Sequence, residues 1–200
     1  MSAYPLVLAS ASPRRRDLLA SVGIAVTILP ADIDETALPS EHGVEMALRL
    51  CREKAEVASR RVSVPSLVLA ADTVVLLEGE SLGKPRDEAE ARSMLASLSG
   101  RVHEVATAFA IRRSDDARLS HVQAVRSSVR FRVLGEAEIA AYVDTGEPMD
   151  KAGGYGIQGQ GAGLVLAISG SYSNIVGLPL AEVIEALSLL GGPRPFSAGK

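Results

Sequence analysis

The most informative pattern in the chain is an almost unbroken apolar run over residues 67–77, with one carboxylate, Asp72, at its centre. Pro65 and Gly79 flank this run. Because the run lacks the polar alternation of a half-exposed strand, it predicts a strand that is covered on both faces, as in a parallel or mixed α/β sheet.

Shorter patterns on both sides of this run predict further strands and helices. A strand is expected over 6–9, followed by a helix with Ser12 as its N-cap and Pro13 as its first residue. Apolar spacings of three and four predict a helix over 44–60, with Lys54 on its apolar stripe. The other expected strands are 25–29, 102–111, 119–133 and 164–168, and the other expected helices are 87–98, 136–143 and 179–190.

The two long strands 102–111 and 119–133, joined by a turn over 114–117, predict an antiparallel hairpin attached to the sheet. Neither a dividing linker nor an internal repeat interrupts the pattern. We therefore expect an α/β fold with a single domain over residues 1–192 and a mobile tail over 193–200.

Composition restricts the function classes. The 200 residues carry a net charge of −3 and are 47% hydrophobic, which suits one globular domain and argues against broad binding of nucleic acid or membrane surfaces. The single Cys51 and three separated histidines predict neither a disulfide nor structural zinc. Without an apolar run of membrane-spanning length or a signal-peptide pattern, we expect a cytoplasmic protein.

Asp72 is the first candidate for a functional residue. Burying an unpaired carboxylate costs several kcal/mol, so this side chain must meet a cation, a metal or a cleft. The alternative interpretation is a structural aspartate that caps a neighbouring loop.

The segment 10–16 leads from a strand into a helix whose first turn holds Arg14, Arg15 and Arg16. Free N–H groups at a helix start attract an anion, and arginines there oppose the helix dipole unless an anion compensates them. The pattern favours a phosphate-binding turn over the alternative of a solvated basic turn. The three arginines point about 100° apart, so they cannot all share one ligand.

Lys54 and Lys84 are further candidate phosphate ligands. Lys54 could instead extend to water along the helix, and Lys84, between Gly83 and Pro85, could be an ordinary surface lysine. Glu35 and Asp72 supply the hard oxygen donors that suit Mg²⁺ or Mn²⁺. Together these residue types indicate phosphoryl chemistry.

Three other kinds of site are rejected. Residues 154–159 match G-x-G-x-x-G, but no strand precedes them and no helix opens from them, as a dinucleotide site requires. Lys151 precedes its glycines, so it is not the lysine of a Walker A loop. Neither a G-x-S-x-G turn nor a recognisable triad order supports a serine or cysteine hydrolase.

Five ordered motifs together resemble the Maf family of nucleoside triphosphate pyrophosphatases over nearly the whole chain. They are SASPRRRDLL at 10–19, ADTVV at 71–75, GKP at 83–85, DKAGGYGIQG at 150–159 and VGLPL at 176–180. The resemblance implies a Maf/ITPase-like α/β fold, with a mixed, strongly twisted sheet, flanking helices and two lobes around a nucleotide cleft, often in a homodimer. It also implies metal-dependent hydrolysis of a nucleotide to its monophosphate and pyrophosphate.

By this resemblance, the catalytic aspartate of the family, a proton acceptor, falls on Asp72. Three positions that separate its subfamilies fall on Arg14, Thr73 and Gln158. The branch that acts on dTTP and UTP carries these residue types, whereas the 7-methyl-GTP branch carries tryptophan, glutamine and glutamate. Residues 106–108 read Ala-Thr-Ala, a departure from the many members that have glycine after the threonine.

The sequence therefore predicts a nucleotide pyrophosphatase, a hydrolase acting on acid anhydrides, with dTTP and UTP as substrates and modified pyrimidine triphosphates as further candidates. The expected phosphate-binding residues are Ser10, Arg14, Lys54 and Lys84. A divalent cation would be held by Glu35 and Asp72, and Asp72 would either hold this metal or take a proton from the attacking water. The alternatives are a 7-methyl-GTP-type pyrophosphatase and a nucleotide-binding regulator of cell division without turnover.

Overall fold

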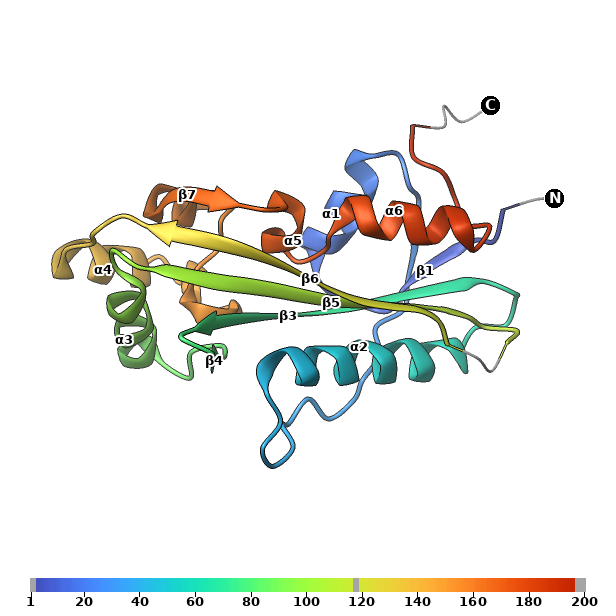
Figure 1. Cartoon of the computed structure of the whole chain (residues 1–200), viewed down its shortest axis with the longest axis horizontal. Coiled ribbons are helices and arrows are strands. Elements are labelled where there is room, and N and C mark those ends of the chain that lie inside the picture. Colours follow the sequence, from blue (N-terminus) through green and yellow to red (C-terminus); the bar gives the residue numbers. More distant parts are fainter. Residues whose placement is uncertain (1–2, 117–118, 197–200) are drawn as a thin grey trace. The chain divides into compact units, whose positions relative to one another are not determined.

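The computed structural model describes residues 3–116 and 119–196. Within them the strands form one seven-stranded sheet in the order β2-β1-β3-β5-β6-β7, with β4 paired to β3 (Figure 1). The strands are β1 Leu6–Leu8, β2 Thr27–Ile28, β3 Leu67–Leu77, β4 Glu80–Leu82, β5 Val102–Arg113, β6 Leu119–Phe131 and β7 Val165–Ser169. β1 is parallel to β2 and β3, whereas β4 is antiparallel to β3 and β7 to β6, so the expected mixed sheet is confirmed.

Helices flank this sheet. The α-helices in the described part of the chain are α1 Pro13–Ser21, α2 Gly43–Ser59, α3 Glu88–Leu98, α4 Glu136–Val143, α5 Tyr172–Val176 and α6 Leu180–Leu189. The glycine-rich segment between α4 and β7 forms only short 3-10 helices, which are η1 Glu147–Asp150, η2 Ala152–Gly154 and η3 Gly159–Leu164.

The predicted elements agree with these bounds where the local signal is strong. β3 and α4 have the predicted limits, and α1 begins at Pro13 after Ser12. The pattern does not predict β4 or α5, and the strand expected over 25–29 is limited to Thr27–Ile28. β4 has only three residues, exposed or half-buried, so it depends on pairing with β3 and not on a pattern of its own.

The chain divides into two compact units. Unit 1 contains Met1–Asp72, Thr107–Val125 and Gly177–Lys200, and unit 2 contains Thr73–Ala106 and Arg126–Val176. β3, β5 and β6 each contribute residues to both units, so no single linker separates them. Residue 117 of the predicted turn and residues 197–200 of the predicted tail lie outside the described residues.

The core of unit 1 follows from the alternation of side chains along β1 and β3. One set of alternate residues joins α1 and α6 in a buried cluster that includes Leu6, Leu8, Leu67, Leu69, Ala71, Leu19, Val183 and Leu187. Successive side chains of a strand point to opposite faces, so Val68, Ala70 and Asp72 face the other way. On that side lies α2, opposite α1 and α6 (Figure 1), with its stripe of small and apolar residues buried.

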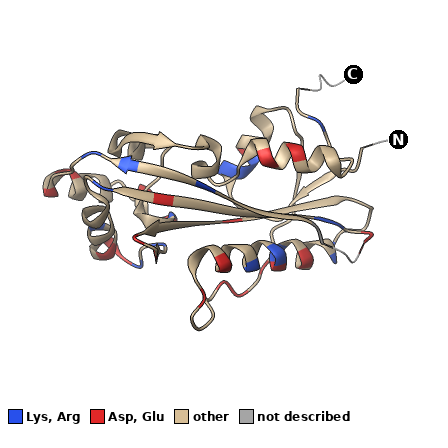
Figure 2. Cartoon of the chain, viewed as in Figure 1, with Lys and Arg blue, Asp and Glu red and all other residues tan. Residues whose placement is uncertain are grey.

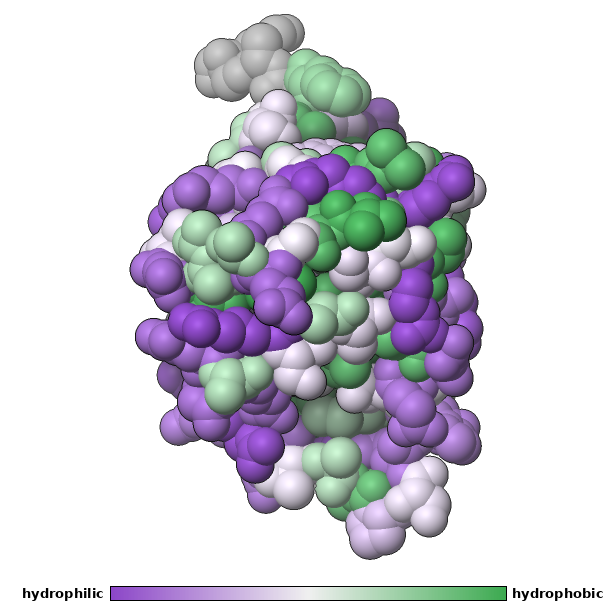
Figure 3. Space-filling view, turned by 90° about the vertical axis from the view of Figure 1, so that its left-hand side faces the viewer, coloured by the Kyte–Doolittle hydropathy of each residue, from purple (hydrophilic) through white to green (hydrophobic). Residues whose placement is uncertain are grey.

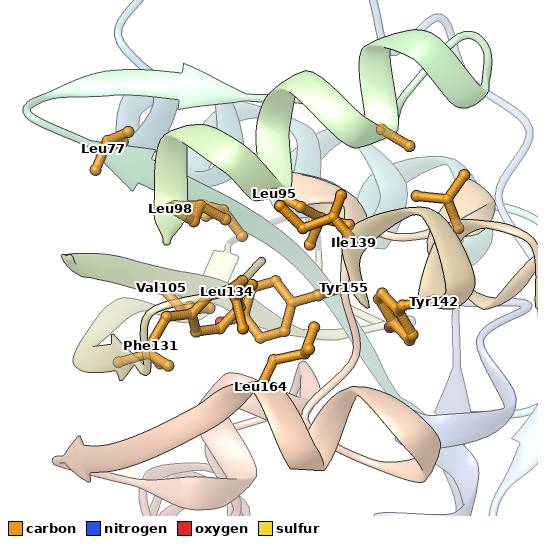
Figure 4. Close-up of a cluster of buried hydrophobic side chains, with 14 of the residues drawn as sticks. Leu77, Leu95, Leu98, Val105, Phe131, Leu134, Ile139, Tyr142, Tyr155 and Leu164 are labelled. Carbon is orange, nitrogen blue, oxygen red and sulfur yellow. The ribbon is translucent and has the colours of Figure 1, made fainter. Parts of the chain in front are cut away.

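The core of unit 2 is built around aromatic rings. Phe131 and Tyr155 meet edge to face with ring centroids 4.7 Å apart, and Leu95 of α3 and Ile139 of α4 pack in the same cluster (Figure 4). His103 is buried beside them, with Nε2 2.7 Å from the Tyr155 hydroxyl.

The surface carries charges of both signs. Figure 2 shows acidic and basic residues interspersed along α2. On the face drawn in Figure 3, apolar residues are likewise scattered among hydrophilic ones. This mixture agrees with the small net charge of −3, which implies that any anion-binding site is local.

His103 gives the fold a testable pH dependence. Burial lowers the pKa of His103 from 6.5 to about 4. Between pH 4 and pH 6.5, the His103 side chain binds a proton in the unfolded chain but not in the folded protein. Protonation therefore favours the unfolded state, so the free energy of unfolding that depends on neutral His103 is complete above about pH 6.5 and is lost as the pH falls toward 4.

Between pH 7 and pH 5, we expect the wild-type protein to lose on the order of 2 kcal/mol more of its free energy of unfolding than His103→Gln, whose amide does not titrate. Denaturant titrations of both proteins at the two pH values measure the difference. Equal losses in the two proteins would contradict the assignment to His103.

Candidate functional site

Three charged side chains meet at one point of unit 1, which we call the Lys54 cluster. Nζ of Lys54, on α2, lies 2.7 Å from Oδ1 of Asp72 on β3 and 2.8 Å from Oε1 of Glu35. The side-chain exposure is 9% for Lys54, 14% for Asp72 and 52% for Glu35. The cluster is therefore closed at its lysine and open to solvent at Glu35.

Helical periodicity explains why Lys54 is directed inward. It follows Leu50 by four residues and Cys51 by three, and both of these are buried, so all three lie on the stripe of α2 that faces the sheet. Asp72 lies on the face of β3 that α2 covers. The ammonium of Lys54 therefore binds carboxylates and does not extend along the helix surface to water.

The loop that carries Glu35 is held against α2 by Arg49. Arg49 donates to the two carboxylate oxygens of Glu41 at 2.7 and 2.8 Å, and to the carbonyl of Thr36 at 3.0 Å. Its hydrogen bonds lower the pKa of Glu41 to about 2. Thr36 also donates its N–H and its hydroxyl to Asp34. Asp34 and Thr36, the neighbours of Glu35, are thus held by the hydrogen bonds between them and by the bond from Arg49 to the Thr36 carbonyl.

Ser10 lies two residues after β1 and accepts two hydrogen bonds. Its Oγ accepts from the N–H of Ser12 at 3.2 Å and from Nη1 of Arg15 at 3.1 Å. Nε of Arg15 donates to the carbonyl of Gly177 at 2.8 Å. Arg15 therefore ties the turn before α1 to the segment that precedes α6.

The sequence pattern places Arg15 in the arginine-rich turn but not among the four expected phosphate-binding residues. Burial lowers the pKa of Arg15, while the negative charges of Asp72 and Glu35 act in the opposite direction. The available signal was its spacing, because Arg15 precedes the buried Leu19 by four residues and so lies on the inner face of α1. Arg14, its half-buried neighbour, stays the candidate for subfamily selection.

The remaining predicted residues lie in unit 2. Thr73 is half-buried in β3, whereas Lys84 and Gln158 are exposed in loops. The carbonyl of Gly83, next to Lys84, accepts from the N–H of Gly153 at 2.9 Å. The loop of Lys84 is therefore tied to the glycine-rich segment that also carries Gln158.

The carboxylates of the Lys54 cluster supply the oxygen ligands that divalent cations such as Mg²⁺ prefer. No group of three or more His, Cys, Asp and Glu residues with metal-binding geometry occurs among residues 3–116 and 119–196. Glu35 and Asp72, however, both approach one ammonium and offer hard oxygen ligands. Two carboxylates with substrate phosphates as further ligands are a common arrangement for Mg²⁺.

Cys51 is not a nucleophile in this fold. It is buried on α2, its thiol donates to the carbonyl of Leu48 at 3.3 Å, and burial raises its pKa to about 12. A thiol needs a lowered pKa to act as a nucleophile.

For the helices that the structure describes, none combines the length and apolar character required to cross a membrane.

Comparison with known proteins identifies close relatives. The chain is 53% identical over 199 residues to a protein from Anaeromyxobacter sp. (strain Fw109-5) named dTTP/UTP pyrophosphatase, covering 98% of this chain and 94% of the relative. It is 54% identical over 193 residues to a protein of the same name from Anaeromyxobacter dehalogenans (strain 2CP-1 / ATCC BAA-258), covering 96% of each.

A solved structure of a nucleoside-triphosphatase / dITP/XTP pyrophosphatase from Mycobacterium abscessus aligns with 94% of this chain and 95% of its own. The TM-score of this alignment is 0.44 and the sequence identity is 15%. The family model described as "Maf-like protein" matches residues 5–190, nearly the whole chain. With the motifs and the mixed α/β sheet already described, this match shows that the chain belongs to the Maf-like protein family.

Proposed function

We propose that this protein hydrolyses dTTP and UTP to the corresponding monophosphate and pyrophosphate, with modified pyrimidine triphosphates as further substrates. The observation that carries the proposal is the identity of 53% and 54% with two relatives named dTTP/UTP pyrophosphatase, over almost the entire chain. The Lys54 cluster supplies the acid–base and ionic groups that such a reaction needs.

The reaction replaces one phosphorus–oxygen bond by another. Water attacks the α-phosphorus, a new bond forms to its oxygen, and the bond to the oxygen that bridges to the β-phosphorus breaks. The electron pair of that bond leaves with pyrophosphate. One carboxylate oxygen of Asp72 accepts the proton of the attacking water, as a general base.

Cationic and polar groups hold the phosphates during this step. In our proposal Arg14 and Lys84 contact the phosphate chain directly, and Ser10 supports the turn before α1. Lys54 contributes a third positive charge while it holds Asp72 and Glu35 in place. Preorganised charges of this kind stabilise the transition state more than the ground state.

Glu35 would hold the divalent cation, Mg²⁺ or Mn²⁺, and Asp72 would be its second carboxylate ligand in the alternative in which another group accepts the proton. When bound, such a cation neutralises charge that develops on the phosphate oxygens. The 52% exposure of the Glu35 side chain leaves this carboxylate accessible to solvent and ions.

Selection of the base is assigned to Arg14, Thr73 and Gln158, which match the dTTP/UTP branch. A hydroxyl and an amide can pair with the oxygen and N–H edge of uracil or thymine. Sites built from such groups reject ligands that leave them unpaired. The relatives favour neither the 7-methyl-GTP alternative nor the regulator without turnover.

The nucleoside triphosphate is the proposed partner. We further propose a homodimer and a cytoplasmic location, as the family resemblance and the composition imply, with neither nucleic acid nor a membrane as a partner. Sedimentation analysis of the purified protein tests the homodimer.

The first test is release of pyrophosphate from a panel of triphosphates. We expect rapid release from dTTP and UTP with Mg²⁺ or Mn²⁺, and a fall to background when a chelator removes the metal, because the phosphate charge is then uncompensated. Release that persists in chelator would remove the metal from the proposal, and no release from any nucleotide would favour the regulator.

Glu35→Gln removes one proposed ligand of the cation, so this variant should require more Mg²⁺ than the wild-type protein to reach half of its maximal rate.

A second test addresses the proton acceptor. Asp72→Asn keeps the shape of the side chain and removes its charge, so we expect kcat for UTP to fall about 100-fold or more. Asp17→Asn is the matched control, because Asp17 is an exposed carboxylate on α1 that pairs with Arg16. Circular dichroism establishes that both variants fold. Undiminished turnover by folded Asp72→Asn would show that another group accepts the proton.

A third test exchanges the three selecting residues together. Arg14→Trp, Thr73→Gln and Gln158→Glu should lower kcat/KM for UTP and raise kcat/KM for 7-methyl-GTP, a change of about 100-fold in their ratio. The metal requirement should be unchanged. An unaltered ratio in the folded triple variant would mean that these side chains do not select the base.

A further inference from the structure

The glycine-rich loop that carries Gln158 is folded around one carboxylate, that of Glu147. Oε1 of Glu147 accepts a hydrogen bond from the N–H of Gly161 at 3.0 Å, and Oε2 accepts one from the N–H of Gln160 at 3.0 Å. Both donors are backbone groups of the loop. A single side chain thereby holds the backbone immediately after Gln158.

Tyr142 extends this anchor to the other side of Gln158. Its hydroxyl donates to Oε1 of Glu147 at 3.0 Å and accepts from the N–H of Gly156 at 3.3 Å. The Tyr142 ring is buried with Tyr155 in the core of unit 2 (Figure 4). The loop is therefore connected to the rigid core at Gly156, before Gln158, and at residues 160–161, after it.

Electrostatics agree with this geometry. Burial alone would raise the pKa of Glu147, but the N–H groups of Gly161 and Gln160, with the Tyr142 hydroxyl, lower it below the ordinary value. Burial raises the pKa of Tyr142, so its hydroxyl stays protonated and able to donate. Glu147 is thus an ionised acceptor surrounded by donors.

Glycines allow the loop to approach the anchor this closely. A Cβ atom at residue 159 would lie 2.8 Å from Oε2 of Glu147, and one at residue 161 would collide with the carbonyl oxygen of Gly156 and lie 2.6 Å from the Tyr142 hydroxyl. Gly159 also has φ of +69°, which side chains disfavour. Gly159 is therefore explained by its close approach to Glu147, and Gly161 by its close approach to the Gly156 carbonyl and the Tyr142 hydroxyl.

We propose that Glu147 is a positioning residue for Gln158, and that its carboxylate holds the loop in the conformation that presents the Gln158 amide to the pyrimidine base. This inference rests on the proposed function. Glu147 does not touch the substrate and acts through the backbone on both sides of Gln158. The exposed Gln158 side chain is left available for the ligand.

Hydrogen exchange tests the anchor without reference to activity. In Glu147→Gln, which loses the charge and one acceptor oxygen, we expect the amides of Gly156, Gln160 and Gly161 to exchange about tenfold faster or more. Glu136→Gln is the matched control, an exposed carboxylate on α4, and should leave these amides unchanged. Unchanged exchange in folded Glu147→Gln overturns the anchor. If this variant does not fold, Tyr142→Phe replaces it, with the same direction expected.

Kinetics test whether the anchor acts through Gln158. In Glu147→Gln we expect kcat/KM for UTP to fall about tenfold, mainly through a higher KM, because a displaced loop binds the base poorly. In a Gln158→Ala background the same change should have less than about a twofold effect. An equal loss in both backgrounds overturns the positioning role. If the wild-type protein turns over no triphosphate, the proposed function fails and the positioning role with it, whereas hydrogen exchange still decides the anchor.

Discussion

The contact on which the rest of the site depends is that of the Lys54 ammonium with Asp72 and Glu35. A carboxylate in the middle of a covered strand is costly unless a cation meets it, and removing one partner of a buried pair costs about 3 to 5 kcal/mol. Lys54 solves this problem from a neighbouring element, because α2 covers the face of β3 on which Asp72 lies. The pair thereby links α2 to the sheet, and it places a carboxylate beside a loop that is open to solvent.

That loop carries the solvent-exposed end of the Lys54 cluster. Exposure rises from Lys54 and Asp72 to Glu35, so the inner two groups are shielded while the outer carboxylate meets solvent. The loop that carries Glu35 is held against α2, because Arg49 donates hydrogen bonds to Glu41 and to the carbonyl of Thr36. A site of this kind combines rigid groups from a helix and a strand with one accessible ligand, which favours preorganised electrostatics.

In unit 2 the glycine-rich segment is positioned by side chains of neighbouring segments. The proposed selecting residue, Gln158, lies in the glycine-rich segment immediately before the 3-10 helix η3. Glu147 and Tyr142 accept hydrogen bonds from the backbone N–H groups of residues 156, 160 and 161, and glycines let this backbone come near enough to reach them. The loop thus owes its shape to side chains of other segments, in contrast to Lys54 and Asp72, which are positioned by a helix and a strand.

The sequence by itself determined the elements whose signal is local. The apolar run predicts β3 with its observed limits, Pro13 predicts the start of α1, and the motifs identify the family. Only the tertiary structure decided which partner each polar group has. Lys54 and Asp72 are 18 residues apart, Glu147 and Gly161 are 14 apart, and Arg15 and Gly177 are 162 apart. Periodicity shows which face of an element a residue occupies. A hydrogen-bond partner on another element depends on how the elements pack together, and the pattern within one segment does not determine that packing.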